Sequence, residues 1–280
     1  MLRDGALTGR VVLITGGGTG LGRTIAERAS RLGARIAIAS RDPAHLAAAG
    51  DAIRAAGGES LETPTDVRDY RQVRALVAQT IDRYGRLDAL VNNAAGNFVR
   101  PAERLPETAF ANVVDIVLNG GFYAARAAGR ALIAQGQGGA ILNVLATYAW
   151  TGGPGTIHSA CAKAGLLAMT RTLAVEWARH GIRVNGLAPG PLATEGASAR
   201  LWPSDALEER VRSAIPLGRF AALAEVADAA LYLLSDHASY VTGEVLTLDG
   251  GGWLGRGILA GDGPEDGVPV VRRRRRAPRG

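Results

Sequence analysis

Short runs of apolar, often β-branched residues alternate with longer alanine-rich stretches along most of this chain. A run that is apolar throughout is typical of a strand buried on both faces, and the alanine-rich stretches are typical of helices. We predict strands at residues 10–15, 34–40, 60–66, 87–93, 139–145, 182–188 and 244–250. Helices are predicted at residues 21–33, 43–58, 69–84, 107–135, 157–180 and 223–235. This alternation predicts an α/β fold with one doubly wound domain, a seven-stranded parallel sheet and helices on both faces.

Two segments depart from the alternation. Residues 191–216 contain prolines, small residues and one short helix, a composition that is typical of a lid that moves over a site. Residues 252–280 are rich in glycine, proline and charge, so we expect a poorly ordered basic tail. The catalytic domain is accordingly predicted to span residues 1–251.

The charge of the chain is concentrated at its end. The 280 residues carry a formal net charge of +6, but residues 271–280 hold six arginines and no acids. The other residues contain 26 basic and 26 acidic side chains, so no basic face for nucleic acid is expected. The arginine run itself is predicted to be a solvated end rather than an anion or membrane site.

Cysteine usage and hydropathy indicate the compartment. The single cysteine, Cys161, cannot form an internal disulfide, which suits a reducing environment. No N-terminal apolar stretch is long enough for a signal peptide, and no apolar run is long enough to span a membrane. We therefore expect a cytoplasmic location and no membrane association. The four scattered histidines and the cysteine lack the spacing of metal ligands, so no metal site is expected.

The segment TGGGTGLG (15–22) lies between the first predicted strand and the first predicted helix. Glycines at such a turn allow the backbone to approach a pyrophosphate, which the N–H groups of the helix N-terminus bind. In this context the segment predicts a dinucleotide-binding (Rossmann) domain. The cofactor-binding residues expected here are Thr15, Gly16, Gly18, Thr19, Gly20, Leu21 and Gly22.

The end of the second strand indicates which dinucleotide binds. NAD-binding domains usually have an acid there that holds the ribose 2′-hydroxyl, but this strand ends with Ser40 and Arg41. A guanidinium binds a 2′-phosphate through charge-assisted hydrogen bonds, so the sequence favours NADP(H), with Arg23 as a second contact. Asp42 keeps NAD(H) open, because its carboxylate could reach the ribose instead. Asp66, at the end of the third strand, is placed to contact the adenine.

Lys163 is the only lysine in a chain with 31 arginines. A compact ammonium suits a ribose diol better than a planar guanidinium does, which gives one position a reason to keep lysine. With the glycine spacing and the segments NNAAG (92–96) and PGP (189–191), this lysine resembles the short-chain dehydrogenase/reductase family over roughly residues 8–251. The resemblance implies that the lysine holds the nicotinamide ribose and lowers the pKa of a tyrosine one helical turn earlier, the general acid of the family.

Two positions depart from that family pattern. Ser159 stands in place of the tyrosine, and Ala146 stands in place of the serine that orients the substrate. A serine hydroxyl is a far weaker acid than a phenol, so it cannot readily protonate a carbonyl. Either the chain has lost catalysis, or it catalyses a different reduction.

Four segments favour a different reduction. They are NNAAGNF (92–98), DIVLNG (115–120), SACAKAG (159–165) and PGPLATEGASARL (189–201). These segments resemble the 2,4-dienoyl-CoA reductases, a branch of the family in which Ser-x-x-x-Lys replaces Tyr-x-x-x-Lys. The resemblance implies catalytic roles for Asn97 and for Tyr148, eleven residues before Ser159.

The implied reaction is the NADPH-dependent reduction of a 2,4-dienoyl-CoA to a trans-3-enoyl-CoA in the β-oxidation of unsaturated fatty acids. Hydride addition at Cδ moves negative charge to the thioester oxygen, where Tyr148 and Asn97 are expected to form an oxyanion hole. A proton then returns to Cα from water. The resemblance implies that Ser159 and Lys163 hold the ribose and the cofactor, and that Asn119 has a structural and proton-relay role.

The resemblance also implies contacts at the edges of the site and an oligomer. Residues expected along the cofactor are Asn93, Pro189, Gly190, Leu192 and Thr194. Residues expected at the acyl-CoA are Phe98, Arg68 and Arg200. The family habit is a homotetramer, here packed through the helices at 107–135 and 157–180.

Two other functions stay open. The chain could be a carbonyl or alcohol oxidoreductase of the wider family, although Ser159 argues against it. It could also be an NADP(H)-binding protein without catalysis. The joint presence of Lys163, Tyr148 and Asn97 argues against that alternative, because a sensor needs no oxyanion hole.

Overall fold

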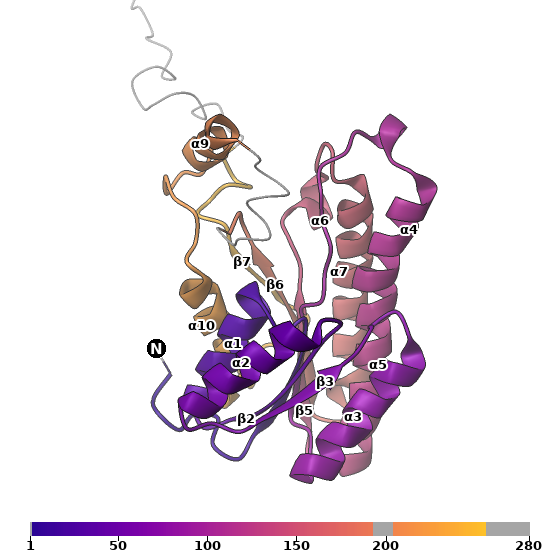
Figure 1. Cartoon of the computed structure of the whole chain (residues 1–280), viewed down its shortest axis with the longest axis vertical. Helices are drawn as coiled ribbons and strands as arrows, with labels where there is room; N and C mark the ends of the chain where they lie inside the picture. Colours follow the sequence, from indigo (N-terminus) through magenta and orange to yellow (C-terminus); the bar gives the residue numbers. More distant parts are fainter. Residues whose placement is uncertain (1, 193–203, 256–280) are drawn as a thin grey trace, which may run out of the picture.

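The computed structural model describes residues 2–192 and 204–255, and the strands in these ranges form one parallel sheet (Figure 1). The seven strands are ordered β3-β2-β1-β4-β5-β6-β7, and every pairing is parallel. The strands are β1 (Val11–Thr15), β2 (Arg35–Ser40), β3 (Ser60–Pro64), β4 (Ala89–Asn92), β5 (Gly139–Val144), β6 (Ile182–Pro189) and β7 (Val245–Leu248). The predicted doubly wound α/β fold is confirmed.

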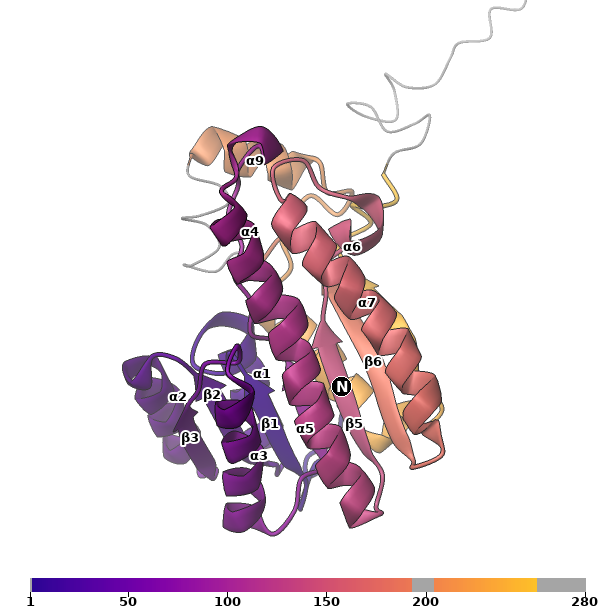
Figure 2. The same cartoon turned by 90° about the vertical axis from the view of Figure 1, so that its right-hand side faces the viewer.

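Helices cover both faces of the sheet (Figures 1 and 2). One face carries α1 (Gly20–Arg31), α2 (Pro43–Ala55) and α10 (Leu223–Leu234). The other carries α3 (Tyr70–Tyr84), α5 (Gly120–Gln135) and α7 (Ile157–Ala178). The remaining helical elements are α4 (Glu107–Val114), α6 (Tyr148–Thr151), α9 (Asp205–Ser213), the π-helical η2 (Asp115–Asn119) and the 3₁₀ turns η1 (Ala102–Arg104) and η3 (Asp236–Ala238).

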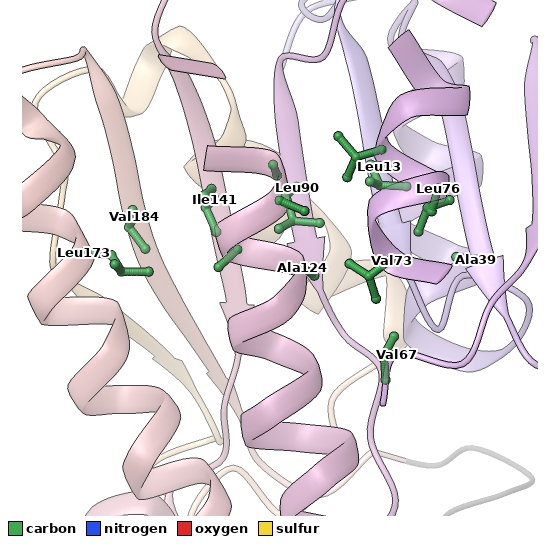
Figure 3. Packing of buried hydrophobic residues seen from close by; sticks show 14 of the residues in the cluster. Leu13, Ala39, Val67, Val73, Leu76, Leu90, Ala124, Ile141, Leu173 and Val184 are labelled. Atoms are coloured by element: carbon green, nitrogen blue, oxygen red, sulfur yellow. The ribbon is translucent and has the colours of Figure 1, made fainter. Parts of the chain in front are cut away.

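Side chains along a strand alternate between two hydrophobic cores. In β1, Val11 and Leu13 pack in the core beneath α3, α5 and α7, whereas Val12 and Ile14 pack in the core beneath α1, α2 and α10. Figure 3 shows the first of these cores, with Leu13 and Ile141 among its members. A strand buried on both faces needs an apolar residue at every position, which is why the strands are continuous apolar runs in the sequence.

The side of the sheet to which successive strands are added changes between β1 and β4. From β1 the chain proceeds outward to β2 and β3, and from β4 it proceeds the other way to β5, β6 and β7. Thr15 and Asn92 end these two central strands and are paired in register. Open α/β sheets bind ligands at such a point, beyond the carboxyl ends of the strands. The loops that follow Thr15 and Asn92 therefore position the site.

The long helix predicted over residues 107–135 is wrong in one respect, because the π-helical turn η2 joins α4 to α5. A π-helical turn accommodates an extra residue, which an alanine-rich pattern does not reveal. Directly after the turn, Gly120 lies against the loop after β3, where a Cβ atom would be 2.7 Å from Cγ2 of Val67. The four-residue helix α6 was not predicted either, because it is too short to show a helical period.

The short helix expected within residues 191–216 is α9, and Leu192 forms an isolated parallel bridge with Ala221. Residues 193–203 lie outside the described residues, as do residues 256–280 of the predicted tail. The lid and the tail therefore stay predictions. Within residues 2–192 and 204–255, no helix has both the length and the apolar character that crossing a membrane requires.

Candidate active site

The glycine loop between β1 and α1 has a shape that only glycine permits. Gly16 and Gly20 have φ values of +66° and +52°, in the left-handed region. A Cβ atom on Gly16 would lie 2.9 Å from Nδ2 of Asn93. A Cβ atom on Gly22 would lie 2.3 Å from the carbonyl oxygen of Gly16. The loop is therefore packed closely against α1 and against the end of β4.

The helix that follows this loop starts without a side-chain cap. Thr19, the N-cap residue of α1, makes no capping hydrogen bond, whereas Oδ1 of Asp42 accepts the N–H of Ala44 at 2.9 Å at the start of α2. Thr19 and Gly20 line the site cleft. Free N–H groups at a helix N-terminus beside a glycine loop bind phosphate, so this part of the site fits the pyrophosphate of a dinucleotide.

Asn93 fastens the glycine loop to the end of β4. Its Nδ2 atom donates to the carbonyl oxygens of Thr15 and Gly16 at 3.2 and 3.1 Å, and its own N–H donates to Oγ1 of Thr15 at 3.1 Å. Thr15 thus links the end of β1 to Asn93 through both its hydroxyl group and its carbonyl oxygen. Asn93 also lines the cleft, so it is placed both to hold the loop and to contact a ligand.

A cleft of about 800 Å³ runs over the carboxyl ends of the strands from the start of α2 to the start of α7. This volume lies in the range of pockets that bind cofactors and small substrates. One end is lined by Ser40, Arg41, Asp42, His45, Thr65, Asp66 and Val67. The other end is lined by Asn97, Val99, Ile116, Ala146, Thr147, Tyr148, Thr156, Lys163, Pro189, Gly190, Pro191 and Leu192.

Arg41 is a free cation at the first end of the cleft. No hydrogen bond or ion pair ties its guanidinium to another residue in the described ranges. The neighbouring Asp42 is committed to the cap of α2, and its second carboxylate oxygen lies 3.4 Å from Nδ1 of His45. The structure does not bring Arg23 to Arg41, because Nε of Arg23 pairs with Glu27 at 2.7 Å on the surface of α1.

Asp66 lines the same end of the cleft and is held by Arg68. Nε of Arg68 donates to both carboxylate oxygens at 2.9 and 3.0 Å, and Nη1 donates to Oδ1 of Asn112 at 2.6 Å. This guanidinium holds the pKa of Asp66 below its usual value, so the carboxylate is ionised at neutral pH. In this arrangement Arg68 orients Asp66, and an acyl-CoA contact of Arg68 would require it to leave the ion pair.

Polar side chains from three elements meet at the hydroxyl group of Tyr148, at the other end of the cleft. Oη of Tyr148, on α6, lies 3.0 Å from Oγ of Ser159 on α7. It accepts a hydrogen bond from Nδ2 of Asn97, in the loop after β4, at 3.3 Å. Burial raises the pKa of Tyr148, and the hydrogen bond from Ser159 opposes that rise. The phenol is therefore a neutral donor at physiological pH.

The orientation of the Asn97 amide is fixed by its own backbone. Its Oδ1 atom accepts the N–H of Phe98 at 3.0 Å, so Nδ2 points to Tyr148. An amide nitrogen carries two hydrogens, and one remains for a ligand. Because Tyr148 accepts from Asn97, and from Ser159 when that hydroxyl donates, its own hydrogen is also left for a ligand. Tyr148 and Asn97 thus present two neutral donors to the cleft.

Lys163 lies one helical turn after Ser159 and reaches the same end of the cleft. Its side chain is 4% exposed, and Nζ donates to the carbonyl oxygen of Val144 at the end of β5. Burial lowers the pKa of Lys163 to about 8. The ammonium group is therefore charged at neutral pH and available as a donor to a hydroxyl group.

Gly190 allows the loop after β6 to lie close to the C-terminal segment. A Cβ atom on Gly190 would be 2.7 Å from Cα of Asp249. Pro189, Gly190 and Leu192 line the cleft, and their contact with a nicotinamide stays a prediction. Thr194 and Arg200 lie outside the described residues.

Several predicted residues do not line the cleft; in the described ranges they are Thr15, Gly18, Gly22, Arg23, Arg68, Phe98, Asn119 and Ser159. Asn119 lies in the π-helical turn, where its Nδ2 donates to Oδ1 of Asp115 at 2.7 Å. The ring of Phe98 stacks on the ring of His158, and its neighbour Val99 lines the cleft instead. Roles for Asn119 in proton relay and for Phe98 at the acyl chain stay predictions.

Some residues of the cleft were not singled out from the sequence. His45 is close to the glycine loop, because a Cβ atom on Gly18 would lie 3.1 Å from Cβ of His45. Ile116 belongs to the segment DIVLNG and Val99 directly follows NNAAGNF, which was the available signal. The described residues hold no group of three or more His, Cys, Asp or Glu side chains that could bind a metal ion.

Comparison with known proteins defines the class. A family model described as enoyl-(acyl carrier protein) reductase matches residues 16–252. A short-chain dehydrogenase from Bacillus anthracis, solved as a crystal structure, is 44% identical with a TM-score of 0.80, over 87% of this chain and 96% of that one. The chain therefore belongs to the short-chain dehydrogenase/reductase family, and it is an oxidoreductase of the kind that uses a nicotinamide cofactor.

Within the family the chain groups with the 2,4-dienoyl-CoA reductases. A probable 2,4-dienoyl-CoA reductase [(2E)-enoyl-CoA-producing] of Bacillus subtilis is 44% identical over 246 residues, which cover 88% of this chain and 97% of the relative. The peroxisomal 2,4-dienoyl-CoA reductase [(3E)-enoyl-CoA-producing] of Pongo abelii is 44% identical over 256 residues, which cover 91% and 85%. The resemblance noted in the sequence is confirmed.

Proposed function

We propose that this protein reduces 2,4-dienoyl-CoA thioesters to trans-3-enoyl-CoA with NADPH. The observation that carries the proposal is the convergence of Asn97 and Ser159 on the hydroxyl of Tyr148. This arrangement provides two neutral donors at one point of the cleft, which suits an oxygen that gains negative charge. It lacks the phenol next to Lys163 with which carbonyl-reducing relatives protonate their product.

Different residues of the cleft would have different roles in this reaction. The glycine loop and the start of α1 would hold the pyrophosphate, and Lys163 would hold the nicotinamide ribose. Bound NADPH would supply the hydride. Tyr148 and Asn97 hold the thioester oxygen and stabilise the charge that reaches it when hydride adds at Cδ. When Ser159 donates to Tyr148, the phenol hydrogen is left for the substrate.

The preference for NADPH rests on the first end of the cleft. Arg41 is free to bind a 2′-phosphate, and Asp42 is occupied by the cap of α2. The helix cap occupies Oδ1 of Asp42, which supports the preference for NADP(H) over NAD(H). Asp66, ionised and oriented by Arg68, is placed for the adenine.

The carbon atom that receives the proton after hydride transfer distinguishes the two products named among the relatives. We propose protonation at Cα by water, which leaves a trans-3 double bond. The proposal is supported by the adjacent donors Tyr148 and Asn97, which line this end of the cleft and are joined by a hydrogen bond. These donors stabilise the dienolate oxygen, and neither is an acid directed at a carbon atom.

A homotetramer and a cytoplasmic location complete the proposal. Apolar side chains are exposed on the outer surfaces of α5 and α7, which lie side by side in Figure 2. Phe122 and Ile133 on α5 are more than a third exposed, and Val175 on α7 is 80% exposed. Contact between copies through these helices would bury them. The single cysteine suits a reducing compartment.

The test of the activity is oxidation of NADPH with trans-2,trans-4-decadienoyl-CoA, with acetoacetyl-CoA and simple ketones as comparison substrates. Turnover of the dienoyl thioester alone supports the proposal, and product analysis by NMR distinguishes the 3-enoyl from the 2-enoyl thioester. Turnover of the ketones would identify a carbonyl reductase instead. No turnover of any substrate, with NADPH still bound, would identify a protein that binds its cofactor without using it.

A further inference from the structure

His158 is a buried histidine without a hydrogen-bond partner. It is the second residue of α7, and its side chain is 0% exposed. Neither ring nitrogen has a hydrogen-bond partner in the described part of the chain. The imidazole stacks on the ring of Phe98, with centroids 4.3 Å apart and planes inclined by 19°. Buried polar groups are nearly always hydrogen-bonded, so an exception needs a reason.

The stack joins the two segments that supply the partners of Tyr148. Phe98 directly follows Asn97, whose Nδ2 lies 3.3 Å from Oη of Tyr148. His158 directly precedes Ser159, whose Oγ lies 3.0 Å from the same atom. The N–H of Phe98 also fixes the amide of Asn97. The two stacked rings are therefore direct neighbours in the chain of the two partners of the phenol.

We propose that His158 is a positioning residue, which as a neutral imidazole holds Phe98 against α7 and so keeps the Asn97 amide on the hydroxyl of Tyr148. This inference rests on the proposed function, because it assigns the stack to the same oxyanion hole. His158 itself touches neither the cleft nor the reacting atoms. Its effect passes through Phe98 and Asn97.

Three features of the surroundings require the neutral form. The ring is fully buried, it has no acceptor for a second N–H, and it lies in the first turn of α7, where the helix dipole is positive. Burial lowers the pKa of His158, and the carbonyl of Phe98 opposes this in part, although it is not in hydrogen-bond geometry with the ring. The structure thus keeps the ring uncharged at physiological pH.

The titratable groups on the elements around His158 do not favour its protonated form. They are Tyr148 on α6, Cys161 and Lys163 on α7, Arg100 after the loop, and Asp115 in the π-helical turn. No ionised side chain in the described ranges is among the causes of the shift at His158. Because the folded-state pKa lies below the ordinary value of 6.5, the unfolded chain takes up this proton first as the pH falls. Protonation of His158 in the folded protein is expected to push the ring out of the stack and to release Asn97.

The first experiment compares the pH dependence of kcat in the wild type, His158→Phe and His158→Ala. The phenylalanine variant keeps a flat ring that cannot be protonated. We expect it to retain turnover at pH 8 and to lose the acid limb that we expect in the wild type well below pH 6.5. The alanine variant is expected to lose kcat by about tenfold or more at every pH, with the Michaelis constant for NADPH nearly unchanged, because Asn97 is no longer held in place.

The matched control is His237→Phe, which replaces an exposed histidine in η3, a turn at the opposite end of the strands from the cleft. It should keep both the turnover and the acid limb. The same acid limb in His158→Phe, or wild-type kcat in His158→Ala, would overturn the proposal.

The second experiment does not depend on turnover. The C2 proton resonance that disappears in His158→Phe identifies His158 in the NMR spectrum of the wild type. We expect this resonance to stay unshifted from pH 8 to well below 6.5, the ordinary pKa of a histidine. Ordinary titration of His158 would overturn the inference even if the enzyme reduces dienoyl-CoA. If the His158 resonance does not shift with pH but the protein does not reduce dienoyl-CoA, the neutral stack is supported and the proposed reaction is wrong.

Discussion

Oη of Tyr148 and Oγ of Ser159 lie 3.0 Å apart, although they belong to the separate helices α6 and α7. The serine stands where the wider family has its acidic phenol, and the phenol of this chain reaches the same region from a different element. The phenol and Lys163 are thus on different helices. In the proposed mechanism, this rearrangement would turn a proton-donating site into one that binds an oxyanion.

Loss of the Tyr148 hydroxyl should remove one of two oxyanion donors. We expect Tyr148→Phe to lower kcat by about 10²–10³ with dienoyl-CoA, because the phenol contributes in the transition state. The dissociation constant for NADPH, measured by fluorescence titration, should stay close to that of the wild type. Tyr240→Phe, at a fully exposed tyrosine, is the control and should change neither quantity. Equal turnover in Tyr148→Phe would contradict the mechanism.

Asn97 and Tyr148 should act as one unit, because one hydrogen bond joins them. We expect Asn97→Ala to lower kcat in the range of about 10²–10³ as well. The double variant should lose less than the product of the two single losses, since each change already disturbs the other donor. A double-mutant cycle on kcat measures this coupling. Fully additive losses would show that the two donors work independently.

The selectivity for NADPH should depend on one arginine. Replacement of Arg41 by alanine removes charge-assisted hydrogen bonds to the 2′-phosphate, so the Michaelis constant for NADPH should rise by about ten- to a hundredfold. The constant for NADH should change little. Arg23→Ala is the matched control, because Arg23 pairs with Glu27 and does not line the cleft. A large effect at Arg23 and none at Arg41 would reverse the assignment.

Lys163 should make cofactor binding sensitive to alkaline pH. Burial lowers its pKa to about 8, so the ammonium group that holds the ribose is lost as the pH rises through this value. The affinity for NADPH should fall between pH 7 and 9, and Lys163→Met should have a low affinity without this pH dependence. A flat profile in the wild type would show that the lysine stays charged.

The same lysine predicts the pH dependence of stability without cofactor. The folded-state pKa, about 8, lies below the ordinary value of 10.5, so between these values the unfolded chain binds more protons. Lys163 therefore contributes an increase in the free energy of unfolding as the pH rises through this window, by up to about 1.4 kcal/mol per pH unit. In denaturant titrations at several pH values, the free energy of unfolding of the wild type should rise with pH relative to that of Lys163→Met. Parallel pH profiles of the two proteins would contradict this prediction.

Gly16 and Gly57 form a matched pair for the glycine loop. Both have positive φ, but a Cβ atom on Gly16 would meet Asn93, and one on Gly57 would meet nothing within 4 Å. Gly57→Ala should cost only backbone strain, about 1 kcal/mol of stability, and leave NADPH binding intact. Gly16→Ala should also weaken NADPH binding by about tenfold or more, because the loop must move. Equal binding in the two variants would show that the loop is adaptable.

The sequence predicted the sheet and the cofactor end of the cleft because these parts depend on local pattern. A continuous apolar run is required of a strand such as β1, and the spacing of Gly16, Gly20 and Gly22 reflects close packing of backbone atoms. Lys163 could also be found from local pattern, because it belongs to the short motif Ser159-x-x-x-Lys163. These features are encoded by neighbours in the chain.

The features that the sequence analysis missed depend on side-chain geometry, which the pattern of apolar and polar positions does not carry. The pairing of Arg23 with Glu27, rather than with a ligand, depends on the rotation of α1 about its own axis. The commitment of Asp42 to a helix cap depends on where α2 begins. The stack of His158 on Phe98 joins the first turn of α7 to the loop after β4, 60 residues earlier in the chain. This stack has no signature in local periodicity.

The uncapped start of α1 gives the cofactor a second role. A ligand that completes a helix binds only the folded chain, and binding of this kind adds about 2.7 kcal/mol to stability when the ligand is present at a hundred times its dissociation constant. The supply of reduced dinucleotide would then determine how many enzyme molecules persist as well as how fast each one works. When that supply falls, the residues around Thr19 are where we expect proteases to gain their first access.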